Sequence, residues 1–459
     1  MGAGPQNYPY RELEFAKDGS PVHPEQAAAV GQLADQVTDV VVISHGWNND
    51  MDEARALYRN LFASIDAVRQ AGGLDLGSRS IGVVGVLWPS KRFADADLIP
   101  GGAAGIGDAD PGLPADLRAT ADAFEAPDAK KILARAATLA DRLDGSPKAQ
   151  REYADLLRSL VRADATEPAD APEEFFHLDG PDLMDRLQRA MLTLSLGAVP
   201  AVAGAGGVYA GDALAVGGAL AVGGSGAAGP AAGEAGGAAG LGSLLTQAWS
   251  TGRTLLNVVT YYEMKDRAGR IGSGSVAPVL HAQVAGRATL HLVGHSFGAR
   301  LVTAAADAQP GAKSVGSLSL LQAAFSHNSF AKEWEPGKPG GFRRMVDERR
   351  VSGSTIITHT RNDKAVGIAY AIASSVADQT SSAIGDADSP FGGLGSNGAQ
   401  HTPEADDVQT LRDVGTRYTF GDGRIHNLLA DQFVSGHGDV TNTQVANAVL
   451  QNVLATPPA

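Results

Sequence analysis

A serine stands between two glycines where an apolar segment ends, in the pentapeptide Gly294-His295-Ser296-Phe297-Gly298. The apolar residues before it predict a buried strand, and residues 297–306 predict a helix that begins directly after the serine. In such an elbow, glycines at the flanking positions leave room for the neighbouring strand and helix, and the hydroxyl projects from the sheet. The spacing therefore predicts a nucleophile at Ser296 and an anion-stabilising backbone N–H at Phe297.

A serine hydroxyl is a poor nucleophile at neutral pH, so it needs a base that accepts its proton. Two polar loops that follow predicted strands supply the candidates, Asp363 in HTRNDKAVG and His437 in FVSGHGDVTN. Loops at the carboxyl ends of parallel strands share one edge of the sheet, which would bring these side chains to Ser296. We expect His437 to exchange the serine proton and Asp363 to hold the required tautomer of His437.

Each of these two assignments has competitors in the sequence. Asp363 also fits a carboxylate at a helix N-terminus, beside Arg361 and Lys364. The other candidates are acids and histidines that lie near predicted strands or loops, namely Asp413, Asp422, Asp431, His426, His359 and His327.

A second loop predicts the other half of an oxyanion site. The sequence Ser44-His45-Gly46-Trp47 follows an apolar strand at 40–43, and the Trp47 N–H, directly after Gly46, is expected to pair with that of Phe297. His45 is expected to steady this loop or simply to pack, and His295 to serve packing or orientation.

The remaining pattern predicts the scaffold. A helix opened by Asp50, with Glu53 three residues later as a capping box, ends at Gly72-Gly73. Further apolar strands are predicted before Pro89 and within 315–321, 354–358 and 423–429, and a helix within 342–351. Strands that are apolar on both faces and alternate with helices indicate a mostly parallel sheet covered by helices.

A large insertion separates the two parts of this core. Residues 91–190 have helical periodicity, and 191–252 are Gly/Ala-rich with only Asp212 and Glu234 charged. We divide the chain into 1–90, an inserted helical and Gly/Ala-rich segment at 91–242, and 243–459. The tract at 191–252 fits a lid segment or small-residue helices that contact lipid or a partner, whereas its composition argues against a membrane span.

Composition narrows the function classes. A net charge of −14 argues against nucleic-acid binding by bulk electrostatics, and the absence of cysteine excludes disulfides, thiolate zinc sites and a cysteine nucleophile. The N-terminus has no apolar signal-peptide core, so we expect a cytoplasmic protein, with peripheral membrane association as an alternative. No P-loop, HExxH or EF-hand pattern occurs, and the expected chemistry needs no cofactor or metal.

The motifs SHGW, GVLWPS, LVGHSFGARLV, HTRNDKAV and SGHGDV together resemble α/β-hydrolase-fold serine hydrolases, especially bacterial esterase-like and lipase-like members. The resemblance covers roughly 270 residues and leaves the insertion outside it. It implies hydrolysis of a small-molecule or lipid carboxylic ester through an acyl-enzyme. The alternatives are a membrane-associated lipase effector that uses 191–252 and a non-catalytic binding module on the same scaffold.

Overall fold

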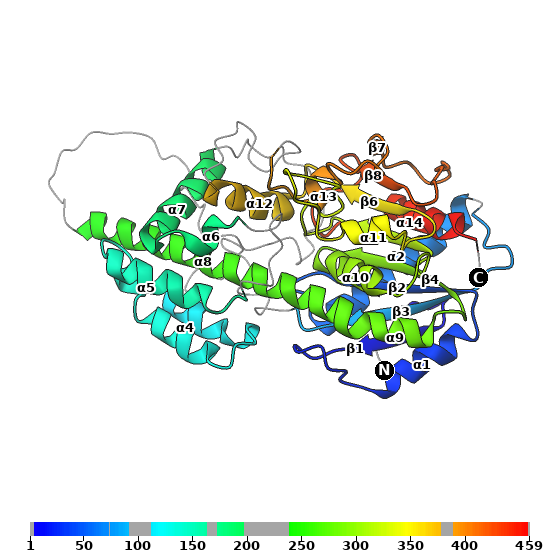
Figure 1. Ribbon diagram of the computed structural model, residues 1–459, viewed down its shortest axis with the longest axis horizontal. Helices are drawn as coiled ribbons and strands as arrows, with labels where there is room; N and C mark the ends of the chain where they lie inside the picture. Colours follow the sequence, from blue (N-terminus) through cyan, green and yellow to red (C-terminus); the bar gives the residue numbers. More distant parts are fainter. Residues whose placement is uncertain are drawn as a thin grey trace, which may run out of the picture.

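The chain folds around one parallel β-sheet. The computed structural model describes residues 4–72, 74–90, 112–162, 172–196, 238–377 and 389–457. Within them eight strands pair in the order β1-β3-β2-β4-β5-β6-β8-β7, and every pair is parallel (Figure 1). The strands are β1 Tyr10–Glu14, β2 Asp39–Ser44, β3 Ile81–Leu87, β4 Thr289–His295, β5 Ser317–Leu321, β6 Thr355–His359, β7 Gln409–Thr410 and β8 Ile425–Leu429. The predicted parallel sheet in an α/β protein is thus confirmed.

Helices cover both faces of the sheet because its central strands are apolar on both sides. Val40 and Val42 of β2 face one core, whereas Val41 and Ile43 face the other. The first core is covered by α1 Glu25–Ala34, α9 Ala277–Gln283 and α10 Phe297–Ala308. The second is covered by α2 Met51–Gly72 and α14 Thr443–Ala455.

The predicted elements differ from the structure mainly at the two edges of the sheet and in the helix after β5. β1 and β7 were not predicted, because β1 is an edge strand with three charged residues and β7 has two residues. The helix predicted within 342–351 is shorter, since α11 spans only Arg343–Asp347. It stops there because Arg349 adopts a left-handed conformation, with φ of 50°, and Val351 pairs with Val315 instead.

The insertion forms a helical region beside the sheet (Figure 1). Its helices are α3 Leu113–Ala119, η2 Ala121–Ala123, α4 Ala129–Ala137, η3 Ala140–Arg142, α5 Pro147–Arg158, α6 Glu174–His177 and α7 Gly180–Leu196. Helix α8, Ala238–Ile271, runs from this region to the sheet and continues through the boundary expected at 242. A π-helical turn at Gly272–Val276 joins it to α9, while α12 Lys364–Val376 packs on α7 and α13 spans Leu394–Asn397.

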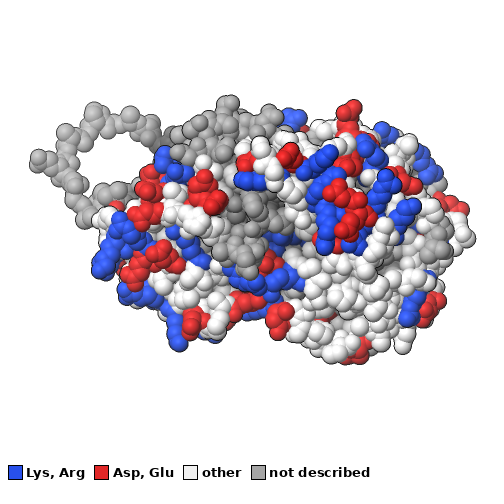
Figure 2. All heavy atoms as spheres, in the orientation of Figure 1, with Lys and Arg blue, Asp and Glu red and all other residues white. Residues whose placement is uncertain are grey.

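The Gly/Ala-rich tract is only partly visible. Residues 197–237, and with them most of the expected lid or lipid-contacting segment, lie outside the described residues. Among the helices that the structure describes, none combines the length and the apolar character needed to cross a membrane. On the face shown in Figure 2, acidic and basic side chains are intermingled.

A buried arginine joins α8 to both the insertion and the sheet. The Arg267 guanidinium is 1% exposed and donates to the carbonyl oxygens of Pro89 and Ala123 at 3.0 and 2.7 Å. It also contacts the carboxylates of Glu263 and Glu125 at 3.1 and 3.2 Å. A buried guanidinium needs hydrogen-bond partners for its N–H groups. These contacts therefore fix α8 relative to the loop that follows β3.

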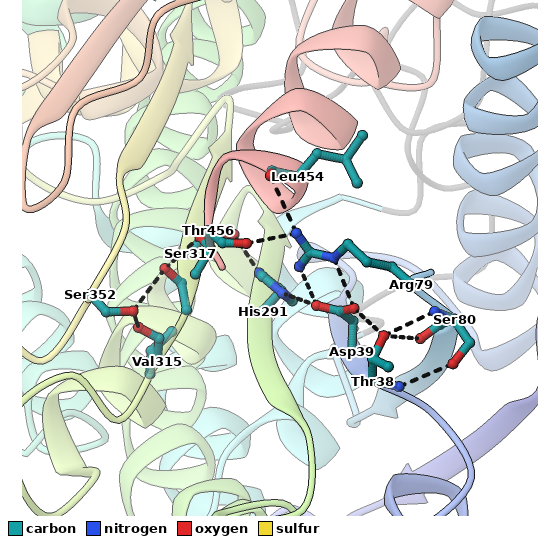
Figure 3. A network of polar contacts seen from close by, with 11 residues as sticks. Thr38, Asp39, Arg79, Ser80, His291, Val315, Ser317, Ser352, Leu454 and Thr456 are labelled. Atoms are coloured by element: carbon teal, nitrogen blue, oxygen red, sulfur yellow. Dashed lines mark hydrogen bonds and ion pairs between the residues drawn. The ribbon is translucent and has the colours of Figure 1, made fainter. Parts of the chain in front are cut away.

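A polar network fixes the amino ends of the central strands (Figure 3). The ring of His291 in β4 contacts Asp39 of β2 at 3.0 Å and Ser317 of β5 at 2.8 Å. Arg79 pairs with Asp39 and donates to the Thr456 carbonyl at 2.6 Å. Although burial disfavours the Asp39 charge, hydrogen bonds from His291 and Arg79 hold its pKa well below the usual range. The network thus ties together the amino ends of β2, β4 and β5, and the loops after β2 and β4 carry candidate site residues at the opposite edge of the sheet.

Candidate active site

Ser296 occupies a strained turn between β4 and α10. Its φ and ψ are 57° and −122°, a backbone conformation that residues other than glycine rarely adopt. Hydrogen bonds to the neighbouring chain hold it there: Ser296 N–H donates to the Leu321 carbonyl at 3.0 Å, and Ala324 N–H donates to the Ser296 carbonyl at 3.2 Å. The elbow predicted from the sequence is therefore present.

The two glycines of the elbow are required by close packing. A Cβ at Gly294 would lie 2.4 Å from the Gly298 carbonyl oxygen, within the turn itself. A Cβ at Gly298 would lie 2.3 Å from the carbonyl oxygen of Ser44 and 2.4 Å from that of His45. These are backbone atoms and cannot move aside cheaply, so the crowding predicted from the Gly-x-Ser-x-Gly spacing is observed.

The loop after β2 passes directly beside the Ser296 side chain. Ser44 pairs with Gly294 in the parallel register of β2 and β4, which brings Gly46 opposite Ser296. A Cβ at Gly46 would lie 2.6 Å from Ser296 Cβ and 3.2 Å from its Oγ. The Trp47 amide follows Gly46, and Phe297 holds the first position of α10, where a backbone N–H has no acceptor within the helix.

His45 supports this loop from beneath. Its Nε2 accepts from Trp88 N–H at 3.3 Å, so the proton lies on Nδ1 and is donated to the Gly46 carbonyl at 3.0 Å. Burial lowers the pKa of His45 to about 4, which keeps the ring neutral. The Tyr58 hydroxyl accepts from His45 N–H at 3.0 Å. His45 thus orients the Gly46-Trp47 peptide.

The predicted capping box anchors the far end of the same loop. Asp50 N–H donates to Glu53 Oε2 at 2.6 Å, and Glu53 N–H donates to Asp50 Oδ1 at 2.9 Å. This reciprocal pair opens α2 and is confirmed.

The structure brings Asp363 and His437 together. His437 Nδ1 lies 2.8 Å from Asp363 Oδ2, and the two residues are 7% and 2% exposed. The other oxygen, Asp363 Oδ1, accepts from Val366 N–H at 3.0 Å in the first turn of α12. Asp363 therefore makes a contact of each competing kind, one with His437 and one with the N-terminus of α12, through different carboxylate oxygens.

His437 lies against the turn that carries Ser296 through a contact with His295. His295 Nε2 is 2.9 Å from the His437 carbonyl oxygen, and the two ring centroids are 4.9 Å apart.

The competing acids have other partners. Asp431 accepts from the Thr360 hydroxyl at 2.8 Å and from Arg361 N–H at 2.9 Å, so it shapes the loop that carries Asp363. Asp413 accepts from the Gln444 side chain at 3.3 Å. Asp422 lines a cavity at the amino end of the sheet, away from the elbow.

The competing histidines are likewise engaged elsewhere. His426 Nδ1 lies 2.9 Å from Asp406, and His327 contacts the Ser389 carbonyl at 3.1 Å. His359 ends β6 and lies 3.4 Å from the Ser396 carbonyl oxygen.

Two further residues near the site could not be identified from sequence patterns. The Tyr261 ring of α8 lies 4.9 Å from the Phe297 ring and 6.3 Å from the Trp47 ring, forming an aromatic wall beside the elbow. Tyr58 supports the loop after β2 through its hydroxyl. Tyr261 and Tyr58 both lie in segments with helical periodicity. In such a segment an aromatic side chain predicts only packing in the core.

The strand order places the site at a topological switch point. β2 and β4 are neighbours, but the chain leaves β2 for β3 on one side and leaves β4 for β5 on the other. In open parallel sheets, ligands bind outside the carboxyl ends of the strands at such a point. Ser296 follows β4 and Gly46 follows β2, so both lie where a substrate crevice is expected.

Comparison with known proteins adds no assignment. No family model, curated protein or solved structure matches the chain. In the described ranges, no group of three or more His, Asp or Glu side chains is arranged to hold a metal ion. The functional argument therefore depends on the geometry of the site.

Proposed function

We propose that this protein is a serine hydrolase with the α/β-hydrolase fold, which cleaves a carboxylic ester through an acyl-enzyme. The observation that carries the proposal is the strained Ser296 elbow at the switch point, next to the buried Asp363–His437 pair. A structural serine turn would need neither the left-handed backbone at Ser296 nor a histidine held by a buried carboxylate.

The proposed reaction has two halves, acylation of Ser296 and hydrolysis of the acyl-enzyme, and each residue has the same role in both. Ser296 Oγ attacks the ester carbonyl while its proton passes to His437 Nε2, and Asp363 stabilises the imidazolium through Nδ1–H. The N–H groups of Phe297 and Trp47 stabilise the oxyanion. His437 then protonates the departing alkoxide, and water repeats the sequence to release the acid and restore Ser296.

The surroundings favour an ester with an apolar group near the carbonyl. Trp47, Phe297 and Tyr261 form the aromatic wall beside the nucleophile, and their rings lie 4.9 to 6.3 Å apart. Phe297 and Tyr261 are 1% and 6% exposed, so the partly exposed Trp47 is the ring that an apolar group would contact by excluding water. We propose small-molecule or lipid esters as the substrate class.

The test is covalent labelling with a fluorophosphonate probe together with turnover of p-nitrophenyl esters. We expect wild-type protein to be labelled and to turn over the esters, and Ser296→Ala to lose both. The exposed Ser78→Ala is the matched control and should behave as wild type. Normal labelling of Ser296→Ala would contradict the proposal, and wild-type protein that neither labels nor hydrolyses any ester would favour a binding module.

A further inference from the structure

His295, which precedes the nucleophile, has a contact that packing alone does not require. Its ring is buried and its Nε2 lies 2.9 Å from the carbonyl oxygen of His437. A carbonyl can only accept, so Nε2 carries the proton. His295 therefore connects the residue that carries the nucleophile to the main chain of the residue that would activate it.

The other ring nitrogen of His295, Nδ1, indicates that the contact through Nε2 determines the orientation of the ring. Nδ1 is buried without a hydrogen-bond partner, and a Cβ at Gly46 would lie 3.2 Å from it. A buried polar atom without a partner is costly, so a ring that served only to pack would be replaced easily by an apolar one. Burial and the nearby His437 lower the pKa of His295 to about 3, so it stays neutral; His45 is the other titratable group that acts on it.

We propose that His295 is a positioning residue for the hydrolase reaction, which holds the His437 main chain against the nucleophile elbow through the Nε2–H to carbonyl hydrogen bond. The kinetic consequence of this inference rests on the proposed function. The hydrogen bond itself is observed independently of that function.

The proposal gives the bond from His295 a part in placing His437. Asp363 contacts one edge of the His437 ring at 2.8 Å, and this contact orients the ring. The bond from His295 fixes the His437 main chain to the last residue of β4, the strand that Ser296 directly follows. The proposed nucleophile and the proposed base are then both held by β4. This limits displacement of one relative to the other, which would slow proton transfer.

Three substitutions separate hydrogen bonding from packing. In His295→Gln, the amide nitrogen sits at the same ε position as the imidazole Nε2 and can still donate to the His437 carbonyl. In His295→Asn, the same amide is one methylene shorter and cannot reach, and His295→Phe keeps the ring shape without a donor. We expect the Asn and Phe variants to lose about 10- to 100-fold in kcat with KM nearly unchanged, and Gln to retain most of kcat.

A second measurement does not depend on activity. In NMR spectra of the wild-type protein, the Nδ1–H proton of His437 and the titration of its ring report the geometry of the Asp363 contact. We expect both to change in the Asn and Phe variants and to return in Gln. Melting temperatures identify a variant that fails to fold, and the comparison is then made between Gln and the remaining variant.

The outcomes distinguish this inference from the proposed function. If no ester is hydrolysed but the His437 signals follow the Asn, Phe and Gln pattern, the hydrolase proposal fails and the positioning contact stands. If kcat, its pH profile and the His437 signals are the same in Phe as in wild type, the inference is overturned. Equal losses in Gln and Asn would also overturn it, because they would show that only packing matters.

Discussion

Replacing Asp363 by Asn tests whether one carboxylate oxygen caps α12 while the other orients His437. In the structure, Oδ1 accepts from Val366 N–H at 3.0 Å and Oδ2 faces His437 Nδ1 at 2.8 Å. Asparagine is as good an N-cap as aspartate, so its carbonyl oxygen should keep the Val366 bond. The amide NH2 must then face His437 Nδ1 and donate to it.

That arrangement places the His437 proton on the wrong nitrogen. With Nδ1 accepting, Nε2 carries the hydrogen and cannot take a proton from Ser296. In serine proteases with this triad, the equivalent change lowers kcat about 10⁴-fold, which corresponds to about 5.4 kcal/mol of transition-state stabilisation. We expect a similar loss for Asp363→Asn, with the free energy of unfolding changed by less than about 1 kcal/mol because the cap remains.

The assay is the turnover of a p-nitrophenyl ester, with stability measured by denaturant unfolding. Asp363→Ala should show the same kinetic loss and an additional destabilisation of about 1 kcal/mol from the missing cap. Asp413→Asn is the control, because Asp413 contacts Gln444 and not the site. If Asp363→Asn keeps kcat within about tenfold of wild type, the assignment of Asp363 as the orienting acid is wrong.

Two further predictions concern stability. Gly298→Ala places a Cβ about 2.3 Å from the Ser44 carbonyl oxygen and should destabilise the protein by about 1 to 3 kcal/mol, measured by denaturant unfolding; an unchanged midpoint would show that the elbow is looser than described. Burial lowers the pKa values of His45 and His359 to about 4 and that of His295 to about 3. The unfolded chain therefore binds more protons below about pH 6.5, so stability should fall from pH 6.5 towards pH 4 by up to about 3 kcal/mol per histidine, and be unaffected by these groups above pH 7. Unfolding midpoints measured from pH 7.5 to 4.5 check this, and a curve that stays level would refute it.

The parts of the fold that could be predicted are those in which the chain itself carries the signal. β2 and β3 are apolar on both faces, and the sequence located them within two residues. The edge strand β1 carries Arg11, Glu12 and Glu14, because one of its sides has no partner strand to bury them. Alternation of polar residues over five positions does not distinguish such a strand from a loop.

The positions of the candidate site residues after their strands were predictable to the same extent. Local spacing located Ser296, and the order of loops after strands indicated Asp363 and His437, since both signals reside in side-chain types. The bond from His295 to the His437 carbonyl had no such signal, because every residue has a carbonyl. The two contacts of Asp363 also could not be told apart from the sequence, since a helix cap and a proposed triad acid call for the same residue type at the same place.

The long helix α8 makes the dimensions of the aromatic wall depend on the insertion. Tyr261 lies ten residues before the end of α8 at Ile271, or about 15 Å along the axis. A tilt of about 5° about that end would move the ring by about 1 Å relative to Phe297, a displacement comparable to the difference between one methylene and none. If the proposed function holds, the way in which the inserted helices hold the far end of α8 would therefore affect which acyl lengths fit beside Ser296.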